Sequence, residues 1–335
     1  MKLQFKTQEY QTQATKRVID IFKGQEKGNR VDIIERKILD DGVFGKKTQE
    51  IKRFSNKEIS LSNEELLKNI QDTQKQDELL KISQNFKAGF NFSIEMETGT
   101  GKTFVYTKTM FELHKNYGWN KVIIVVPSIA IREGVHKSLD ITSDYFKEIY
   151  GKKIRYFIYD TKNSSNLVNI SSFASSSEIE VIIMNYQAFA ISDAHSTFES
   201  NRKIFEKQDF MQSRRPIDVI SGAKPILIID EPQRLGKTAE DKLKEFKALF
   251  TLRYSATHKE DFHKIYRLDA IDAYNQKLVK QISVKAIDIK GDSATGGYVF
   301  FDNIKINPNK NPQAVIEIDV KLKESISKKT IVVNE

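Results

Sequence analysis

The sequence contains no cysteine, which excludes disulfide bonds, thiolate metal sites and cysteine nucleophiles. Its five histidines show no zinc-ligand spacing, and no Gly-x-Ser-x-Gly motif of a serine hydrolase is present. No apolar run approaches the roughly 20 residues that a membrane helix needs, and residues 1–9 contain no signal-peptide apolar region. We therefore expect a cytoplasmic protein without a membrane partner and without thiol, zinc or serine-hydrolase chemistry.

Acidic residues are fewer than basic ones. The chain has 54 Lys and Arg residues and 45 Asp and Glu residues, which give a formal net charge of +9. A basic surface suits nucleic acid or acidic membranes, but the charge alone does not select a partner. The 335 residues, of which 39% are hydrophobic, are enough for one large domain or two ordinary ones.

Residues 96–103, METGTGKT, form the most informative stretch, since they follow an alternating apolar run and open a helical pattern that reaches about residue 117. Gly99 and Gly101 allow successive backbone N–H groups to turn toward an anion. The start of the helix adds its positive dipole end, and Lys102 can reach the outer phosphates of a nucleotide. The stretch predicts a phosphate-binding loop, although Met96 stands where the strict pattern has glycine.

We expect every residue of this loop from 98 to 103 to contact the nucleotide, and the Thr103 hydroxyl to bind Mg²⁺. The residues are Thr98, Gly99, Thr100, Gly101, Lys102 and Thr103. The alternative is a glycine turn before a surface helix, which the flanking strand and helix patterns disfavour.

Short apolar runs alternate with helical stretches from about residue 90 to residue 257. They predict strands at residues 92–96, 122–126, 154–159, 181–184, 226–229 and 249–254. The runs at 122–126 and 226–229 have no polar alternation, as in parallel strands that are buried on both faces. We therefore predict a doubly wound α/β domain with a parallel sheet, whose ligands bind at the carboxyl ends of its strands.

The remaining segments are less regular. Residues 24–60 are charged and show no clear pattern, and the serine-rich residues 163–177 predict a surface loop. A polar helix is expected from about residue 62 to 86, with Ser62 or Asn63 as its cap. After about residue 272, strand-like runs at 278–289, 298–306 and 316–322 and turns between them predict a small antiparallel β unit.

Two carboxylates, Asp230 and Glu231, follow the buried run at residues 226–229, and that strand can lie beside the strand of the phosphate loop. Asp230 there completes a Mg²⁺ site with Thr103 and the phosphates, while Glu231 is placed to polarise the attacking water. We name Glu231, Asp230 and Lys102 as catalytic candidates. A charged turn after a core strand is the alternative.

Three other polar sites also follow predicted strands or begin the chain. Ser255 and Thr257 can relay a change in hydrogen bonding between a nucleotide and a polymer, or they can simply cap the end of a strand. Pro127, Ser128 and Arg132 can hold DNA backbone phosphates, or they can form an ordinary helix cap. The amide of Gln11 can pair with adenine, or it can lie in solvent on a helix.

In this order, the motifs resemble the first motor domain of superfamily 2 helicases and translocases. More narrowly, they resemble the restriction (Res) subunit of type III restriction–modification enzymes. The resemblance is carried by residues 10–11, 96–103, 125–135, 230–233, 254–259 and 266–270. It makes Met96 a family feature and implies a RecA-like P-loop NTPase domain that uses ATP and Mg²⁺.

The resemblance also implies residue roles. Lys102 and Thr103 bind phosphate and Mg²⁺, Asp230 and Glu231 are the Walker B pair, and Gln11 reads adenine. The residues expected to couple hydrolysis to DNA movement are Gln233, Ser255 and Thr257. The residues expected to contact the DNA backbone are Pro127, Ser128 and Arg132.

The implied organisation has three parts. Residues 1–90 are expected to be a helical region that carries the glutamine motif, residues 91–272 the ATP-binding motor domain, and residues 273–335 a β-rich segment. We expect the chain to end before the second motor domain and the nuclease domain of the family's full enzyme. The partners implied are double-stranded DNA, the type III modification (methyltransferase) subunit and a separately encoded carboxy-terminal half.

The expected function is that of an ATP- and DNA-binding motor domain, in which ATP hydrolysis drives DNA translocation in the complete enzyme. An arginine finger from a second domain is worth on the order of 10³–10⁵ in rate, so we expect slow or undetectable turnover from this chain alone. The alternative is a non-catalytic or remnant module that binds ATP and DNA without turnover.

Overall fold

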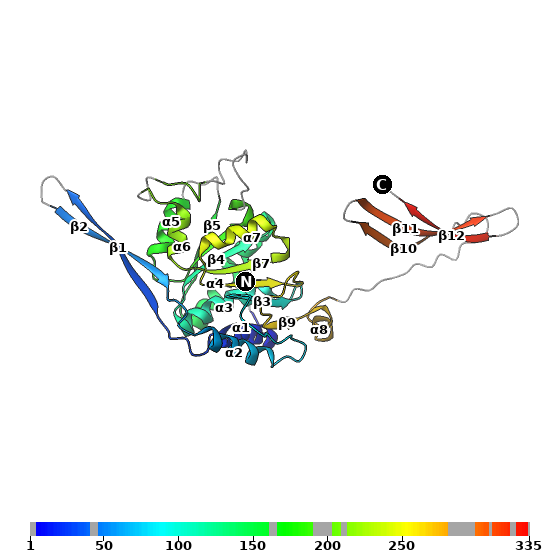
Figure 1. The fold of residues 1–335 in the computed structure, drawn as a ribbon, viewed down its shortest axis with the longest axis horizontal. Coiled ribbons are helices and arrows are strands. Elements are labelled where there is room, and N and C mark those ends of the chain that lie inside the picture. The colour runs from blue at the N-terminus through cyan, green and yellow to red at the C-terminus, as the bar shows by residue number, and fades with distance from the viewer. Residues whose placement is uncertain are drawn as a thin grey trace. The chain divides into compact units, whose positions relative to one another are not determined.

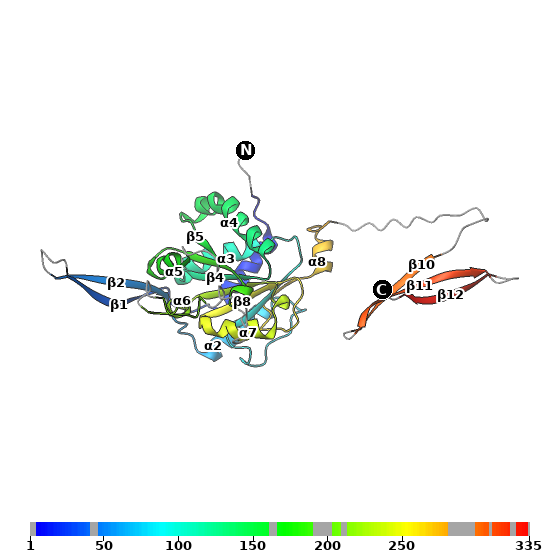
Figure 2. The ribbon, with the colours of Figure 1, turned by 90° about the horizontal axis from the view of Figure 1, so that it is seen from above.

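The computed structural model describes residues 5–40, 46–160, 166–189, 203–208, 213–280, 299–307, 310–321 and 326–333. The chain divides into two compact units, Met1–Lys280 and Gln281–Glu335, which are described separately below (Figures 1 and 2). Within the described ranges, no helix is both long enough and apolar enough to cross a membrane.

A parallel sheet of seven strands forms the centre of the first unit, in the order β5-β6-β4-β7-β8-β3-β9. Its strands are β3 (Asn91–Met96), β4 (Lys121–Val126), β5 (Arg155–Tyr159), β6 (Glu180–Asn185), β7 (Ile226–Asp230), β8 (Phe250–Ser255) and β9 (Tyr266–Leu268). All six strands expected in this region are present, and β9 is an additional one. The four strands β4, β6, β7 and β8 are buried along their whole length. For β4 and β7 this burial was predicted from their unbroken apolar patterns.

Helices cover both faces of this sheet (Figure 1). They are α1 (Glu9–Asp20), α2 (Asn63–Gln74), α3 (Lys102–Tyr117), α4 (Ile129–Tyr150), α5 (Asn166–Ser175), α6 (Pro216–Gly222), α7 (Lys237–Leu243) and α8 (Ala270–Asn275). Alternate residues of β7 point to opposite faces. Ile226 and Ile228 pack with α1 to α4, whereas Leu227 and Ile229 pack with α5 to α7. The α/β fold with a parallel sheet is therefore confirmed.

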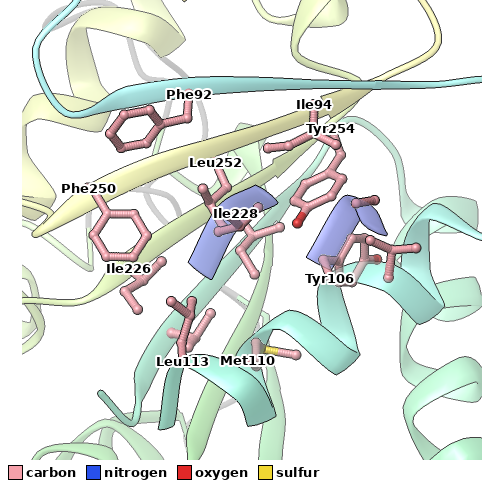
Figure 3. Packing of buried hydrophobic residues seen from close by; sticks show 14 of the residues in the cluster. Phe92, Ile94, Tyr106, Met110, Leu113, Ile226, Ile228, Phe250, Leu252 and Tyr254 are labelled. Atoms are coloured by element: carbon pink, nitrogen blue, oxygen red, sulfur yellow. The ribbon is translucent and has the colours of Figure 1, made fainter. Parts of the chain in front are cut away.

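The face that carries α3 holds the larger core cluster (Figure 3). Phe92 and Ile94 from β3 and Leu252 and Tyr254 from β8 are all fully buried there, against Met110 of α3. Burial of one such side chain contributes about 1.5–3 kcal/mol. This packing fixes the direction of α3 relative to the carboxyl ends of β3, β7 and β8.

The stretch at residues 24–60, which showed no clear pattern, forms an antiparallel hairpin of β1 (Asn29–Asp40) and β2 (Lys46–Asn56). The pairing register shifts between Ile33 and Glu35. Such a bulge interrupts the two-residue period by which strands are recognised in a sequence. At the base of the hairpin, the Asn56 side chain donates to the carbonyls of Lys121 and Lys224 at 2.9 and 2.8 Å.

The prediction of a surface loop at residues 163–177 was wrong, since Asn166–Ser175 is helix α5. Ile170 and Phe173 are fully buried, and Ala174 is almost so. Their spacing of three and four residues forms the apolar face of a helix, which packing stabilises despite the many serines.

The polar helix expected at residues 62–86 is shorter than predicted, because α2 ends at Gln74. Its start has the predicted cap. The Ser62 hydroxyl accepts a hydrogen bond from the Glu65 N–H at 3.2 Å, and the Glu65 carboxylate accepts one from the Ser62 N–H at 2.8 Å. This reciprocal capping box satisfies two backbone donors that the helix itself leaves unpaired.

The second unit is a sheet of three antiparallel strands, β10 (Val299–Asn307), β11 (Lys310–Lys321) and β12 (Ile326–Val333). It confirms the small antiparallel β segment predicted after the α/β domain. The additional strand predicted at residues 278–289 falls largely outside the described residues.

A lysine is buried completely at the start of β4. The Lys121 ammonium donates to the Ser176 carbonyl at 2.6 Å and lies 5.2 Å from the centre of the Phe173 ring. Burial lowers the pKa of Lys121 to about 8, although the nearby Glu180 charge opposes the shift. In the unfolded chain the pKa of a lysine is about 10.4.

This difference predicts that stability depends on pH. Between the two pKa values the unfolded chain binds a proton that the folded chain does not, so the free energy of unfolding rises with pH there and levels off below about pH 8. Relative to Lys121→Met, the wild type should gain about 2 kcal/mol between about pH 7.5 and 9.5 in urea unfolding. Parallel pH profiles for the two proteins would contradict this assignment.

Candidate functional site

The phosphate loop predicted at residues 96–103 connects the carboxyl end of β3 to α3. Gly99 and Gly101 both have left-handed backbones, with φ of +86° and +87°, and α3 begins directly after Gly101. The Thr100 hydroxyl donates to the Glu97 carbonyl at 2.6 Å and closes the turn. The N-terminus of α3 therefore faces the space that the loop surrounds, as phosphate binding requires.

Two side chains of α1 hold this loop from the other side. The Tyr10 hydroxyl and the Gln11 amide both donate to the Thr100 carbonyl, at 2.8 and 3.1 Å. Gln11 is only 8% exposed, so it does not lie in solvent. Its role in reading adenine stays a prediction.

The predicted catalytic residues lie together at the carboxyl edge of the sheet. The Lys102 ammonium is 2.8 Å from Glu231 Oε1, and these side chains are only 11% and 16% exposed. Asp230, the last residue of β7, is buried, and its Oδ1 has no hydrogen-bond partner within the described residues. We expected β7 to lie beside β3. However, β8 separates them, so Lys102 meets Glu231 across the end of an intervening strand.

The surroundings shift the pKa values of the two neighbouring carboxyl groups in opposite directions. Burial raises the pKa of Asp230 to about 6; the charge of Lys102 opposes this shift, and that of Glu231 adds to it. Burial also acts to raise the pKa of Glu231. Hydrogen bonds from Lys102, Gln233 and Ser255 outweigh burial and hold the Glu231 pKa below its usual value. Glu231 is therefore ionised at neutral pH, while Asp230 lies in a setting that favours a cation partner.

The predicted coupling residues contact Glu231 directly. The Gln233 amide donates to Glu231 Oε2 at 2.6 Å, and the Ser255 hydroxyl lies 3.1 Å from the same oxygen. The Ser255 hydroxyl also lies 2.7 Å from Gln233 Oε1 and from the Thr257 carbonyl, so it has three acceptors for one proton. This choice of acceptors gives the group alternative hydrogen-bonding patterns.

Glu231 also has an unusual backbone conformation. Its φ of 54° and ψ of 58° lie in the left-handed region, where a residue with a side chain is disfavoured by about 1–2 kcal/mol. Its N–H donates to the Tyr254 carbonyl at 2.9 Å, which ties this conformation to β8. Strained backbones of this kind are concentrated at functional sites.

The residues present fit a magnesium ion. The unpartnered oxygen of the buried Asp230 is an anionic ligand without a protein partner, and Thr103 supplies a hydroxyl in the first turn of α3. Carboxylate and hydroxyl oxygens are the hard ligands that Mg²⁺ prefers, and it usually combines them with substrate phosphates.

The predicted DNA-backbone residues are on the same edge of the sheet but form a separate group. Pro127 and Ser128 follow β4, and the Ser128 hydroxyl caps α4 by accepting from the Ile131 N–H at 3.3 Å. Arg132 is 14% exposed and pairs with Glu133 at 3.0 Å. Within the described ranges, no hydrogen bond joins these residues to Lys102 or Glu231.

Two tyrosines near the site had no role in the sequence-based prediction. Tyr10 belongs to the glutamine motif, yet its hydroxyl holds the phosphate loop as firmly as Gln11 does. Tyr106 is fully buried on α3, one turn after Thr103. The helical spacing from Thr103 was the available signal, but an aromatic residue on an apolar helix face is most often part of the core.

A parallel sheet with a phosphate loop after β3 and an acidic pair after β7 defines a RecA-like P-loop NTPase domain. The family model described as "Type III restriction enzyme, res subunit" matches residues 4–260. The chain belongs to this family, as the resemblance of its motifs implies.

Curated relatives agree with this assignment. The chain is 31% identical over 251 residues to the Res subunit of the type III restriction-modification enzyme EcoPI from Escherichia phage P1. It is also 31% identical over 244 residues to the EcoP15I Res subunit from Escherichia coli. Each alignment covers 69% of this chain and 25% of the relative, so the chain matches about a quarter of the length of these proteins.

Solved structures show more distant likeness. A nuclease-deletion mutant of the type ISP restriction-modification enzyme LlaGI, in complex with a DNA substrate mimic, is 16% identical with a TM-score of 0.38. That match covers 58% of this chain and 19% of LlaGI. The SWI2/SNF2 ATPase core of Sulfolobus solfataricus in complex with double-stranded DNA is 12% identical with a TM-score of 0.32, over 61% of this chain and 33% of that one. The family assignment rests on the sequence matches.

Proposed function

We propose that this chain is the ATP- and DNA-binding motor domain of a type III Res subunit, an ATP-dependent hydrolase of the helicase and translocase type. In the complete enzyme, its ATP hydrolysis drives translocation along DNA. The observation that carries the proposal is the Lys102–Glu231 pair beside the unpartnered carboxylate oxygen of Asp230.

The side chains suggest how the site works. Lys102 is held by Glu231, and phosphates that enter the loop compete for the same ammonium group. Release of Lys102 frees Glu231 Oε1 to accept a hydrogen bond from the attacking water. Gln233 and Ser255 hold the other oxygen of Glu231 and so fix the direction of the carboxylate. When bound, Mg²⁺ would be held by Thr103 and Asp230 and would neutralise phosphate charge.

The wider proposal includes partners and domain organisation. Double-stranded DNA and the type III modification (methyltransferase) subunit are the proposed partners. Residues 1–90, 91–272 and 273–335 are the proposed parts: the glutamine-motif region, the motor domain and the β-rich segment. Support comes from the net charge of +9 and from the relatives, whose names identify them as subunits of restriction-modification enzymes.

The test is a titration of the chain with a fluorescent ATP analogue and Mg²⁺, followed by ATPase assays with and without duplex DNA. The proposal expects saturable nucleotide binding and a rate that DNA increases, even where the basal rate is low. Nucleotide binding with no turnover under either condition would favour the non-catalytic module instead. Absence of nucleotide binding would overturn both.

A charge substitution tests the proposed DNA contacts. Arg132→Gln should weaken duplex binding and reduce the slope of log affinity against log salt concentration by about 0.9, the value expected for one lost phosphate contact. Affinities measured by fluorescence anisotropy at several salt concentrations give this slope.

The matched control is Arg155→Gln. It removes one positive charge from an arginine that begins β5, at the amino edge of the sheet, and that is 62% exposed. The control should leave the salt dependence unchanged. Equal slopes for the two variants would show that Arg132 contributes only general charge.

A further inference from the structure

A buried tyrosine adjoins the proposed magnesium site. Tyr106 lies on α3, three residues after Thr103, and is completely buried. Its ring meets the ring of Tyr254 from β8 edge to face, with centres 5.5 Å apart (Figure 3). Residues three apart on a helix lie on the same side, so Thr103 and Tyr106 face the sheet together.

The sheet register brings Asp230 to this side of the molecule. Asp230 of β7 is paired with Tyr254 of β8, and residues paired in this way point to the same face of a sheet. Since Tyr254 faces α3, the Asp230 carboxylate faces α3 as well. The three side chains of Thr103, Tyr106 and Asp230 thus converge below the phosphate loop.

Both polar groups at this point lack a hydrogen-bond partner within the described residues. The Tyr106 hydroxyl and Asp230 Oδ1 are fully enclosed and make no hydrogen bond of good geometry there. Most buried polar atoms in proteins are paired, so two unpaired atoms at one place indicate a site that is completed by a ligand.

The chemistry defines which group donates. A phenol hydroxyl carries its proton at neutral pH and can donate it, whereas an ionised carboxylate such as Asp230 can only accept. Packing does not require this hydroxyl, since phenylalanine would fill the same space in the core.

We propose that Tyr106 is a positioning residue of the magnesium site. When a magnesium–nucleotide complex is bound, its hydroxyl would donate a hydrogen bond to the Asp230 carboxylate and hold that carboxylate in the orientation in which it and Thr103 bind the cation. The proposal rests on the proposed function as an ATP-binding domain. It assigns Tyr106 to the shell around the metal ligands, whose loss commonly lowers metal affinity 10–100-fold.

The experiment compares Tyr106→Phe with the wild type in a Mg²⁺ titration at a fixed concentration of a fluorescent ATP analogue. The Mg²⁺ concentration for half-maximal binding should rise about 10–100-fold. Binding of the analogue in the presence of EDTA should be unchanged, because the substitution affects only the metal-dependent part. No ATP turnover is needed for this measurement.

Tyr254→Phe is the matched control. It removes a buried hydroxyl from the same aromatic pair, but that hydroxyl lies 3.4 Å from Thr109 Oγ1. Its Mg²⁺ dependence should equal that of the wild type. The unfolding temperature of Tyr106→Phe should be no lower than that of the wild type, since an unpaired buried hydroxyl is removed.

The outcomes distinguish a failure of the proposed ATP-binding function from a failure of the role proposed for Tyr106. A wild-type chain that binds no nucleotide overturns the proposed function. Normal nucleotide binding, with the same Mg²⁺ dependence in Tyr106→Phe and the wild type, overturns the role of Tyr106 alone. Equal shifts in Tyr106→Phe and Tyr254→Phe also overturn it, because they would indicate a general effect of the aromatic pair.

Discussion

Lys102→Ala is expected to lower the affinity for ATP by about 10- to 160-fold, since a charge-assisted hydrogen bond to phosphate is worth about 1.5–3 kcal/mol. The Lys102 ammonium group lies 2.8 Å from Glu231 and has little exposure to solvent. It is therefore already placed at the mouth of the phosphate loop, and its side chain needs little reorganisation to meet a nucleotide. Calorimetric titration with ATP and Mg²⁺ measures the loss.

The control for this substitution is Lys115→Ala, in the last turn of the same helix, where the side chain is exposed. It removes the same charge from α3 at the end remote from the loop and should not change nucleotide affinity. Lys102→Ala also leaves the Glu231 carboxylate without its cation, so the variant should be checked for folding by circular dichroism. Wild-type affinity in a folded Lys102→Ala protein would refute the assignment of the nucleotide site.

The fold was predictable where burial leaves a mark on the sequence. The unbroken apolar runs of β4 and β7 are diagnostic because strands buried on both faces cannot alternate with polar residues. The lateral order of the strands leaves no such mark, which is why β8 was not expected between β3 and β7. Helix α5 was missed because serine content was given more weight than the spacing of Ile170 and Phe173.

In the site, too, local sequence motifs were predictable and contacts between distant residues were not. The phosphate loop and the Asp230–Glu231 pair are local motifs, and their chemistry follows from adjacent residues. The contact between Lys102 and Glu231 depends on the intervening strand, and the group around Ser255 depends on side-chain rotamers. The helical spacing of Tyr106 from Thr103 is a weak signal, because only the register of β7 with β8 reveals what its hydroxyl faces.

The second large effect is expected at the glycines of the phosphate loop, where two similar positions differ in one contact. Gly99 and Gly101 have nearly the same left-handed φ, +86° and +87°. A Cβ at Gly99 would meet nothing within 4 Å, whereas a Cβ at Gly101 would lie 2.7 Å from Gln11 Nε2. Alanine at either position introduces backbone strain of about 1–2 kcal/mol, but only Gly101→Ala must also displace Gln11.

Gly101→Ala is therefore expected to lower the free energy of unfolding by about 2–3 kcal/mol, and Gly99→Ala by about 1–2 kcal/mol. The additional loss is the buried hydrogen bond from the Gln11 amide to the Thr100 carbonyl. Urea unfolding of the nucleotide-free proteins measures both values. In a double-mutant cycle, the losses from Gln11→Ala and Gly101→Ala should sum to about 1 kcal/mol more than the loss in the double variant, because both remove the same hydrogen bond, whereas Gln11→Ala and Gly99→Ala should be additive. Additive effects in both cycles would mean that Gln11 does not pack against the loop, and the predicted contact of Gln11 with adenine would then lose its structural basis.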